Sequence, residues 1–291
     1  MLLSAVAFSS KAVMVKLAYA YGVDVETLLV LRMAFAAPFY LGIAVWLYLT
    51  GKVEHLERGD LLVITMLGVV GGYLPMWLDF AGLAYVSAGL ERIILFLYPT
   101  FVVLISAMVF GRIVGRHELL ALGLCYAGVA MAAGGDVLAV GQLTHQAVLG
   151  TALVFFSALI YAGYLVASGR LIPRLGVLPF TAIIMLVASL TATGHYLVLP
   201  HQASLTGLPT QVYGIALMMA VVATVLPSFM LSAGIHRVGS SRAAMYGMAG
   251  PVSTILLAYL FLGEAIGLLQ LAGTGFVIAG VFAITARPGR T

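Results

Sequence analysis

The chain has 291 residues, of which 63% are hydrophobic and 8% are charged, and its formal net charge is +4. A soluble domain has about a quarter of its residues charged, so this composition excludes a soluble enzyme and a soluble binding module and indicates a protein embedded in lipid. The one cysteine, Cys125, excludes an intrachain disulfide, and the scattered basic residues form no patch for a nucleic acid.

Ten apolar runs follow one another along the chain. About 20 residues cross the hydrocarbon core of a bilayer as a helix, so each run is long enough to span or nearly span it. The expected spans are 1–20, 27–49, 60–84, 88–110, 117–134, 147–168, 177–199, 210–235, 240–262 and 266–286. The sequence therefore predicts an all-α membrane protein with ten transmembrane helices.

The loops on one side of these spans carry almost all of the basic residues. If ten spans are counted from the amino terminus, these residues all lie on the same side of the membrane as that terminus: Lys52, Arg58, Arg112, Arg116, Arg170, Arg174, Arg237, Arg242, Arg287 and Arg290. Short loops rich in Lys and Arg stay in the cytoplasm. We expect a protein of the bacterial inner membrane with both termini cytoplasmic and with Asp24, Glu26 and Glu264 outside.

The chain aligns with itself, without a gap, at an offset of 152 residues. Leu74 and Pro75 fall on Leu226 and Pro227, and Pro99 falls on Pro251, although the chain has only ten prolines. Each half holds five spans, an odd number, so the second copy enters the membrane from the opposite side. The sequence predicts two inverted five-helix repeats, residues 1–135 and 146–287, around a central cavity.

The paired prolines lie at positions that a cavity would need. Pro75 and Pro227 fall inside the third and eighth expected spans, and Pro99 and Pro251 inside the fourth and ninth. A proline inside a helix removes a hydrogen bond and kinks the helix. We expect four kinked helices around a central space near the middle of the membrane; the alternative is that these prolines only shape their own helices.

Aromatic and hydroxyl side chains recur on the expected helix faces. Tyr73 and Trp77 are four residues apart, and Leu95 and Tyr98 share a face of the next span. An aromatic ring with a polar tip suits a substrate that is partly apolar. The predicted substrate-binding residues are Lys11, Tyr73, Trp77, Leu95, Tyr98, Tyr161, Tyr164, Thr224, Ser228, Tyr246 and Ser253. The alternative is that the aromatic residues fill the membrane interior or form interfacial belts.

A charge inside the membrane is costly, so each such residue is a candidate for function. We expect Lys11 near the middle of its span, as the one deep cation available to a substrate. The other charges are expected towards the outer ends of their helices: Lys16, Arg32, Asp79, Glu91 and Arg92. They either neutralise one another as a structural network, or Asp79 or Glu91 exchanges a proton while Lys16 or Arg32 meets an anionic group.

The chain holds no recognisable catalytic or metal-binding motif. The six histidines fall at expected helix ends or in loops, where we expect them to be solvated, and their spacing is not that of metal ligands. No nucleophile motif and no phosphate-binding loop is present. We therefore expect no catalytic residue, no metal and no cofactor.

The end of the chain carries the most specific motif. The stretch L-G-E-A-I-G-L-L-Q-L-A-G-T-G-F-V-I-A-G-V, from Leu262 to Val281, resembles the closing motif of the ten-helix EamA-type branch of the drug/metabolite transporter superfamily. Ala249–Val252 matches the proline helix that precedes this motif in the family. Ala7–Ala18 is similar to the family's first span, with Lys16 on its lysine, and Arg32 lies where the family commonly has an arginine.

The resemblance covers essentially the whole chain, with three departures. Phe8 replaces a tryptophan, Lys11 takes a normally uncharged position, and Arg112 stands where the first repeat often has the glutamate matched by Glu264. The resemblance implies a basket of helices whose third, fourth, eighth and ninth members, with the first and sixth, wall a cavity. It also implies transport of metabolites, often export of amino acids.

We expect a secondary transporter that exports aromatic or neutral amino acids, or related amphipathic compounds, by alternating access. Its expected partners are a small-molecule substrate and the lipid bilayer, with protons as a candidate coupling ion, and it is expected to be a monomer or a homodimer. The alternatives are a non-transporting scaffold or channel-like pore and an intramembrane enzyme that acts on lipid.

Overall fold

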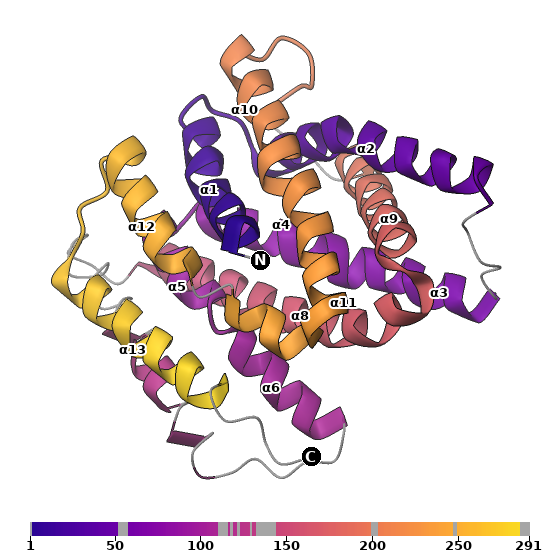
Figure 1. The fold of residues 1–291 in the computed structure, drawn as a ribbon. Coiled ribbons are helices and arrows are strands. Elements are labelled where there is room, and N and C mark those ends of the chain that lie inside the picture. Colours follow the sequence, from indigo (N-terminus) through magenta and orange to yellow (C-terminus); the bar gives the residue numbers. More distant parts are fainter. Residues whose placement is uncertain are drawn as a thin grey trace.

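The computed structural model describes residues 2–51, 58–109, 116, 119–120, 123–128, 130–131, 144–198, 203–246 and 249–285. All regular secondary structure within these residues is helical (Figure 1). Eight of the 18 residues of the expected fifth span, 117–134, and most of the junction between the expected repeats lie outside the described residues, as does Arg112.

Between residues 2 and 109, the described part of the chain forms six α-helices and one π-helix. Asp24 caps the second helix and Ser87 caps the fifth, each by accepting a hydrogen bond from a backbone amide in the first turn. The elements are α1 (Leu2–Tyr19), α2 (Val25–Leu49), α3 (Arg58–Met66), η1 (Leu67–Tyr73), α4 (Leu74–Leu83), α5 (Ala88–Leu95) and α6 (Tyr98–Val109).

The second half continues in the same manner, and Thr144 caps its first helix. Its elements are α8 (His145–Leu175), α9 (Val177–Val198), α10 (Thr210–Ala220), η2 (Val221–Val225), α11 (Leu226–Tyr246), α12 (Ala249–Leu262) and α13 (Leu268–Thr285). Gly239, with φ 78°, interrupts α11 in a conformation that L side chains rarely adopt.

Six helical stretches among the described residues are long and apolar enough to cross a membrane. They are Val25–Leu49, Gly59–Leu83, Ala88–Val109, His145–Leu175, Val177–Val198 and Thr210–Ser240. Two shorter apolar helices are Ser253–Leu262 and Leu268–Gly280. The expectation of an all-helical membrane protein is thereby confirmed for the part of the chain that the structure describes.

The bounds of the elements repeat at the offset found in the sequence. Helices α2 and α9 begin at Val25 and Val177, which are 152 residues apart. The π-helices η1 and η2 end at Tyr73 and Val225, each directly before a Leu-Pro pair. Gly239, where α11 is interrupted, lies 152 residues after the cap of α5.

The prolines act on the backbone in two different ways. Pro75 and Pro227 each follow a π-helix, in which the hydrogen bonds have shifted by one residue. Pro99 does not kink a continuous helix as expected: α5 ends at Leu95, and Pro99 is the second residue of α6. A proline is tolerated in the first turn of a helix because its missing N–H would have no helical partner there.

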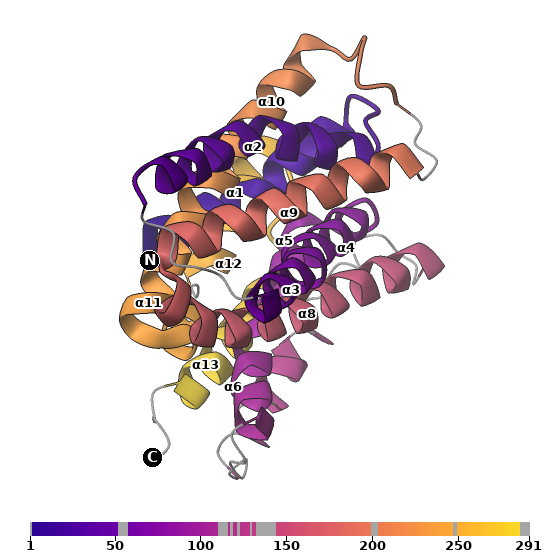
Figure 2. The same cartoon turned by 90° about the vertical axis from the view of Figure 1, so that its right-hand side faces the viewer.

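The buried apolar side chains form two clusters. One cluster joins α1, α2, α9 and α10 and includes Leu28, Met33 and Tyr40. The other joins α5, α6, α8 and α11 and includes Ile93 and Phe101. Figures 1 and 2 show α2 and α9 side by side, whereas α6 and α13 lie at the opposite end of the molecule from α2. The candidate site lies between the two clusters.

Candidate functional site

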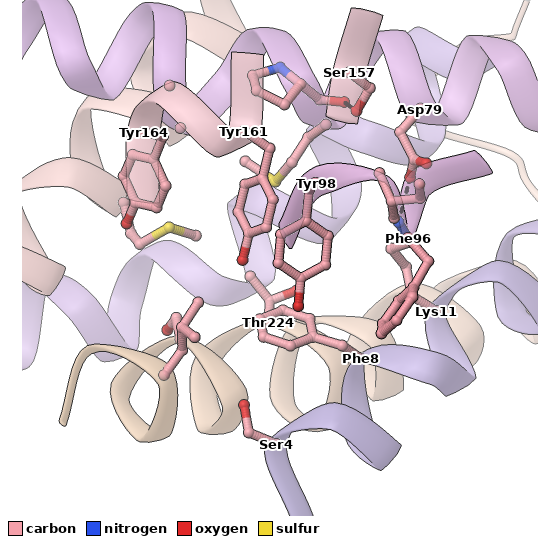
Figure 3. Close-up of a pocket in the computed structure, with 18 of the residues that line it drawn as sticks. Ser4, Phe8, Lys11, Asp79, Phe96, Tyr98, Ser157, Tyr161, Tyr164 and Thr224 are labelled. Carbon is pink, nitrogen blue, oxygen red and sulfur yellow. Dashed lines mark hydrogen bonds and ion pairs between the residues drawn. The ribbon is translucent and has the colours of Figure 1, made fainter. Parts of the chain in front are cut away.

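A cavity of about 160 Å³ lies between the two apolar clusters (Figure 3). This is smaller than the roughly 300–1,000 Å³ of a pocket for a drug-sized ligand, so the cavity fits a small metabolite. Its lining consists of Ser4, Phe8, Lys11, Arg32, Gly71, Gly72, Pro75, Met76, Asp79, Arg92, Leu95, Phe96, Tyr98, Ser157, Tyr161, Tyr164, Met185, Thr224, Ser228, Leu231 and Ala243.

Helical periodicity explains how these side chains reach the cavity. Three helices each present three residues at spacings of four and three, which places them on one face. These triplets are Ser4, Phe8 and Lys11 on α1, Ser157, Tyr161 and Tyr164 on α8, and Thr224, Ser228 and Leu231 on η2 and α11. The same spacing in the sequence could have predicted four lining residues that the aromatic and hydroxyl pattern missed: Ser4, Phe8, Ser157 and Leu231.

Tyrosine rings form one wall of the cavity. The rings of Tyr98 and Tyr161 meet edge to face, with centroids 5.3 Å apart, and Tyr161 stacks on Tyr164 at 5.9 Å. In Figure 3 the three hydroxyl groups point into the cavity, towards the side where Thr224 and Phe8 lie. The wall therefore offers an aromatic surface with polar tips, which suits an amphipathic molecule.

Lys11 joins two buried carboxylates at one end of the cavity. Its ammonium donates to Asp79 Oδ2, as drawn in Figure 3, and lies 3.4 Å from Glu91 Oε1. Arg92 Nε lies 3.9 Å from Glu91 Oε2, and Arg92 Nη2 donates to the carbonyl of Phe8 at 2.9 Å. Lys11, which was expected alone near mid-span, is thus part of the same charge cluster as Asp79, Glu91 and Arg92.

Arg32 enters the cavity from α2 and is only 2% exposed. Its Nε donates to Thr224 Oγ1 at 2.6 Å, and Nη2 lies 3.4 Å from the carbonyl of Ala223. The guanidinium carbon is 5.2 Å from the centroid of the Phe80 ring, a cation–π distance. Lys11 is therefore not the one deep cation, since Arg32 and Arg92 line the cavity too.

Two predicted binding residues, Tyr73 and Trp77, lie outside this lining. Both pack edge to face against His195, with ring centroids 5.6 and 5.4 Å away, and the Tyr73 hydroxyl is hydrogen-bonded to His195 Nδ1. Trp77 Nε1 donates to Glu26 Oε1 at 3.2 Å. His195 is half-buried between these rings and not fully solvated as expected.

The remaining predicted residues are dispersed. Lys16 is half-buried on α1, and Ser253 is half-buried on α12. The Pro227 carbonyl accepts a hydrogen bond from Ser4 at 3.1 Å, and Pro99 is buried at the start of α6. The side chains of Tyr246 and Pro251 lie outside the part of the structure that is described.

Asp24 makes polar contacts that join the loop between α1 and α2 to the segment before α10. Asp24 Oδ1 accepts from Thr27 Oγ1 at 2.7 Å and from the amide of Ala203 at 3.0 Å. Burial acts to raise the pKa of Asp24, but the hydrogen bonds from Thr27 and Ala203 outweigh it, so its pKa lies below the usual value. The α1–α2 loop is thereby fixed to the segment that precedes α10.

The described residues hold no group of three or more His, Cys, Asp or Glu side chains that could bind a metal ion. The buried carboxylates Asp79 and Glu91 are instead held by Lys11 and Arg92. The chemistry that the cavity offers is therefore charge pairing, hydrogen bonding and aromatic contact with a small molecule.

Comparison with known proteins relates nearly the whole chain to membrane transporters. The pattern of the EamA-like transporter family matches residues 1–134 and 148–286. "Uncharacterized transporter YcbK" of Bacillus subtilis is 34% identical over 287 residues, which cover 97% of this chain and 91% of that protein. An "Uncharacterized transporter" of Archaeoglobus fulgidus is 22% identical over 80% of this chain and 81% of that protein.

A solved crystal structure has a similar fold. It superposes with a TM-score of 0.64 over 97% of both chains, at 19% sequence identity. At this identity the likeness concerns the course of the backbone, and the side chains of the cavity have to be interpreted from this chain alone.

Proposed function

The chain belongs to the EamA-like transporter family and is a multi-pass membrane transporter; from this premise we propose that it carries small amphipathic metabolites by alternating access. The family match confirms the resemblance noted in the closing motif, Leu262–Val281. We place the protein in a bacterial inner membrane with both termini cytoplasmic, as the distribution of basic loop residues indicates.

The observation that carries the proposal is the cavity between the two apolar clusters. It is small, buried among ten helical elements, and lined by both charged groups and aromatic rings. Secondary transporters bind their substrates near the middle of the membrane, between repeats. The proposed substrate-binding residues are Lys11, Leu95, Tyr98, Tyr161, Tyr164, Thr224 and Ser228.

We propose that the two halves are inverted five-helix repeats, 1–135 and 146–287, in a ten-helix protein. The equal offset of η1 and η2 supports this arrangement, because each π-helix precedes the same Leu-Pro pair. Rocking one apolar cluster against the other would then open the cavity to either side in turn, without repacking inside a cluster.

The proposed substrates are aromatic or neutral amino acids and related compounds, moved outwards. The tyrosine wall can stack on a ring or an apolar side chain, as Tyr98, Tyr161 and Tyr164 do among themselves. The cavity volume of about 160 Å³ suits a molecule of this size and not a nucleotide sugar.

We propose protons as the coupling ion, bound at the pair of carboxylates that share Lys11. Lys11 contacts both carboxylates, so a proton on one of them would leave the other paired with the ammonium. Glu91 is fully buried, so a change in its charge would be felt strongly by Lys11 and Arg92. An imposed pH gradient should drive uptake by the wild type, and Glu91→Gln should lose that dependence.

The test of the transport proposal is uptake of a metabolite panel into proteoliposomes. We expect saturable uptake of aromatic or branched amino acids, which Tyr161→Ala reduces at least tenfold. Trp77→Ala serves as the matched aromatic control, because Trp77 lies outside the cavity lining, and it should retain uptake. Equal uptake by the Tyr161→Ala variant would remove the cavity from the mechanism. Unsaturable leak would indicate a channel-like pore.

A further inference from the structure

The charges around the cavity do not balance. Lys11 and Arg92 are held by the carboxylates of Asp79 and Glu91, so these four groups together are formally neutral. Arg32 also lines the cavity, and its contacts are to a hydroxyl group, a carbonyl and an aromatic ring, none of which is charged. The cavity therefore holds one net positive charge among its described residues.

The contacts of Arg32 fix its position and leave one end of the guanidinium available. Thr224 Oγ1 accepts from Arg32 Nε and itself donates its only hydrogen to the Met219 carbonyl at 2.8 Å, which orients its oxygen towards Arg32. Among the described residues, Arg32 Nη1 is buried without a hydrogen-bond partner. A buried charged donor without a partner is costly, so the site has a strong preference for an anion at that position.

We propose that Arg32 is the group that recognises a carboxylate on the transported molecule. A guanidinium is the natural partner of a carboxylate, to which it can donate from two nitrogens. One bound carboxylate would supply the missing partner of Nη1 and would compensate the charge of the Arg32 guanidinium. The aromatic wall of Tyr98, Tyr161 and Tyr164 lines the same cavity and would contact the apolar part of the molecule.

This inference rests on the proposed transport function. It narrows the substrates of the transporter to compounds with one carboxylate and an apolar or aromatic side chain. A positively charged amine without a carboxylate should be excluded, because it would add to an uncompensated positive charge. A molecule with several phosphates would bring more negative charge than the single unpaired cation can match.

The test compares three probes of nearly equal shape. These are phenylalanine, 3-phenylpropionate, which lacks the amine, and 2-phenylethylamine, which lacks the carboxylate. For the purified wild type, binding is measured by thermal stabilisation, and transport by uptake into proteoliposomes. We expect the two carboxylates to bind and the amine not to bind.

Arg32→Gln should weaken binding of both carboxylates by about ten- to a hundred-fold, the loss expected for one charge-assisted hydrogen bond. Arg32→Lys should recover part of the affinity because it keeps the charge. Thr224→Val, which frees the guanidinium from its anchor, should weaken the carboxylates several-fold. Arg237→Gln is the matched control, since Arg237 is exposed on α11.

Equal binding of the amine, or wild-type affinity of Arg32→Gln for 3-phenylpropionate, would overturn the role of Arg32. Should Arg32→Gln fail to fold, the three probes on the wild type and the Thr224→Val variant still decide the question. Transport of 2-phenylethylamine by the wild type would leave the transport proposal standing and refute this inference alone. Uptake of no probe and of no member of the metabolite panel would refute both.

Discussion

At the scale of single residues, Lys11 has the most demanding environment. Its ammonium is 9% exposed as a residue average and lies between the carboxylates of Asp79 and Glu91, which are 2% and 0% exposed. Removing one partner from a buried ion pair leaves an uncompensated charge in a medium of low dielectric constant. Removing one of these charges without its partner should therefore destabilise the fold.

Lys11→Met should lower the free energy of unfolding by about 3–5 kcal/mol, since it strands two buried carboxylates. Unfolding in detergent, followed by circular dichroism, measures the loss. The double variant Lys11→Met/Asp79→Asn removes opposite charges together and should recover a large part of it. A Lys11→Met variant as stable as the wild type would contradict the charge cluster described for the cavity.

Asp24 should make the stability of the protein depend on pH. Its pKa is lower in the folded protein than the usual value, so its carboxylate stabilises the fold at pH values above about 4. That contribution is lost as the pH falls through the folded-state pKa. The difference in unfolding temperature between wild type and Asp24→Asn should be present at pH 7 and shrink at pH 3. A difference that grows on acidification would contradict the contacts to Thr27 and Ala203.

The sequence offered a network of Asp79, Glu91 and Arg92 as one of two alternatives, but it did not predict that Lys11 joins them. A helix rises 1.5 Å per residue, so Lys11 lies about 12 Å before the end of α1 and Asp79 about 6 Å before the end of α4. Counting residues places them at different depths, but the four-carbon stem of a lysine covers such a difference. Periodicity also cannot show that Arg32 meets Thr224, because it defines a helix face and not the partner of that face.

At the scale of elements, Glu264 links the last part of the chain to the first half. Its two carboxylate oxygens accept hydrogen bonds from the amides of Ala88 and Gly89, at 3.1 and 3.3 Å, which are the first residues of α5. These amides have no partner inside the helix, and a negative charge at a helix N-terminus is favourable. This contact gives a physical reason for the glutamate of the closing motif.

Glu264→Ala should destabilise the protein by about 1–2 kcal/mol, as the loss of a helix cap does. Hydrogen exchange should become faster at the amides of Ala88 and Gly89, while Glu264→Gln should show a smaller change. Gln146→Ala, an exposed substitution in the first turn of α8, is the control. Unchanged exchange at both amides would show that the cap does not stabilise α5.

The crossing of α4 and α8 depends on Gly150. A Cβ atom at this position would lie 2.7 Å from Tyr85 Cβ and 2.9 Å from Val86 Cγ1, closer than real Cβ contacts allow, and 3.1 Å from the Gly82 carbonyl. Gly150→Ala should therefore force the helices apart and cost about 1–3 kcal/mol.

Gly163 provides the matched control on the same helix, since a Cβ there would meet nothing within 4 Å. Gly163→Ala should be neutral, or stabilising by up to about 1 kcal/mol, because alanine favours the helix more than glycine does. Thermal unfolding of the two variants in parallel measures the difference. Equal effects at both positions would contradict the close approach at Gly150.

Helices begin where the sequence predicts when a strong N-cap residue precedes them. Asp24 and Ser87 are preferred N-cap residues, and α2 and α5 begin directly after them. The π-helices before Pro75 and Pro227 were not predicted, since a proline indicates a disturbed helix and not the form of the disturbance. The break before Pro99 likewise depends on how α5 and α6 pack and not on the proline alone.

At the scale of the whole molecule, the repeat is the feature that the sequence predicts most directly. The offset that pairs Pro75 with Pro227 also relates the starts of α2 and α9 and the ends of η1 and η2. The location of the cavity follows less directly from the sequence, because it depends on how the two apolar clusters meet. Tyr73 and Trp77 show this, since their face of the third span packs against His195.

The central claim is that a carrier alternately exposes the cavity between the two clusters to either side of the membrane. Counterflow in proteoliposomes tests it most directly, with unlabelled phenylalanine inside and a trace of labelled phenylalanine outside. A carrier should accumulate label transiently above the outside concentration, and Tyr161→Ala should abolish the overshoot while Trp77→Ala retains it. Equilibration of the label without any overshoot in the wild type, at a rate independent of internal phenylalanine, would contradict the account.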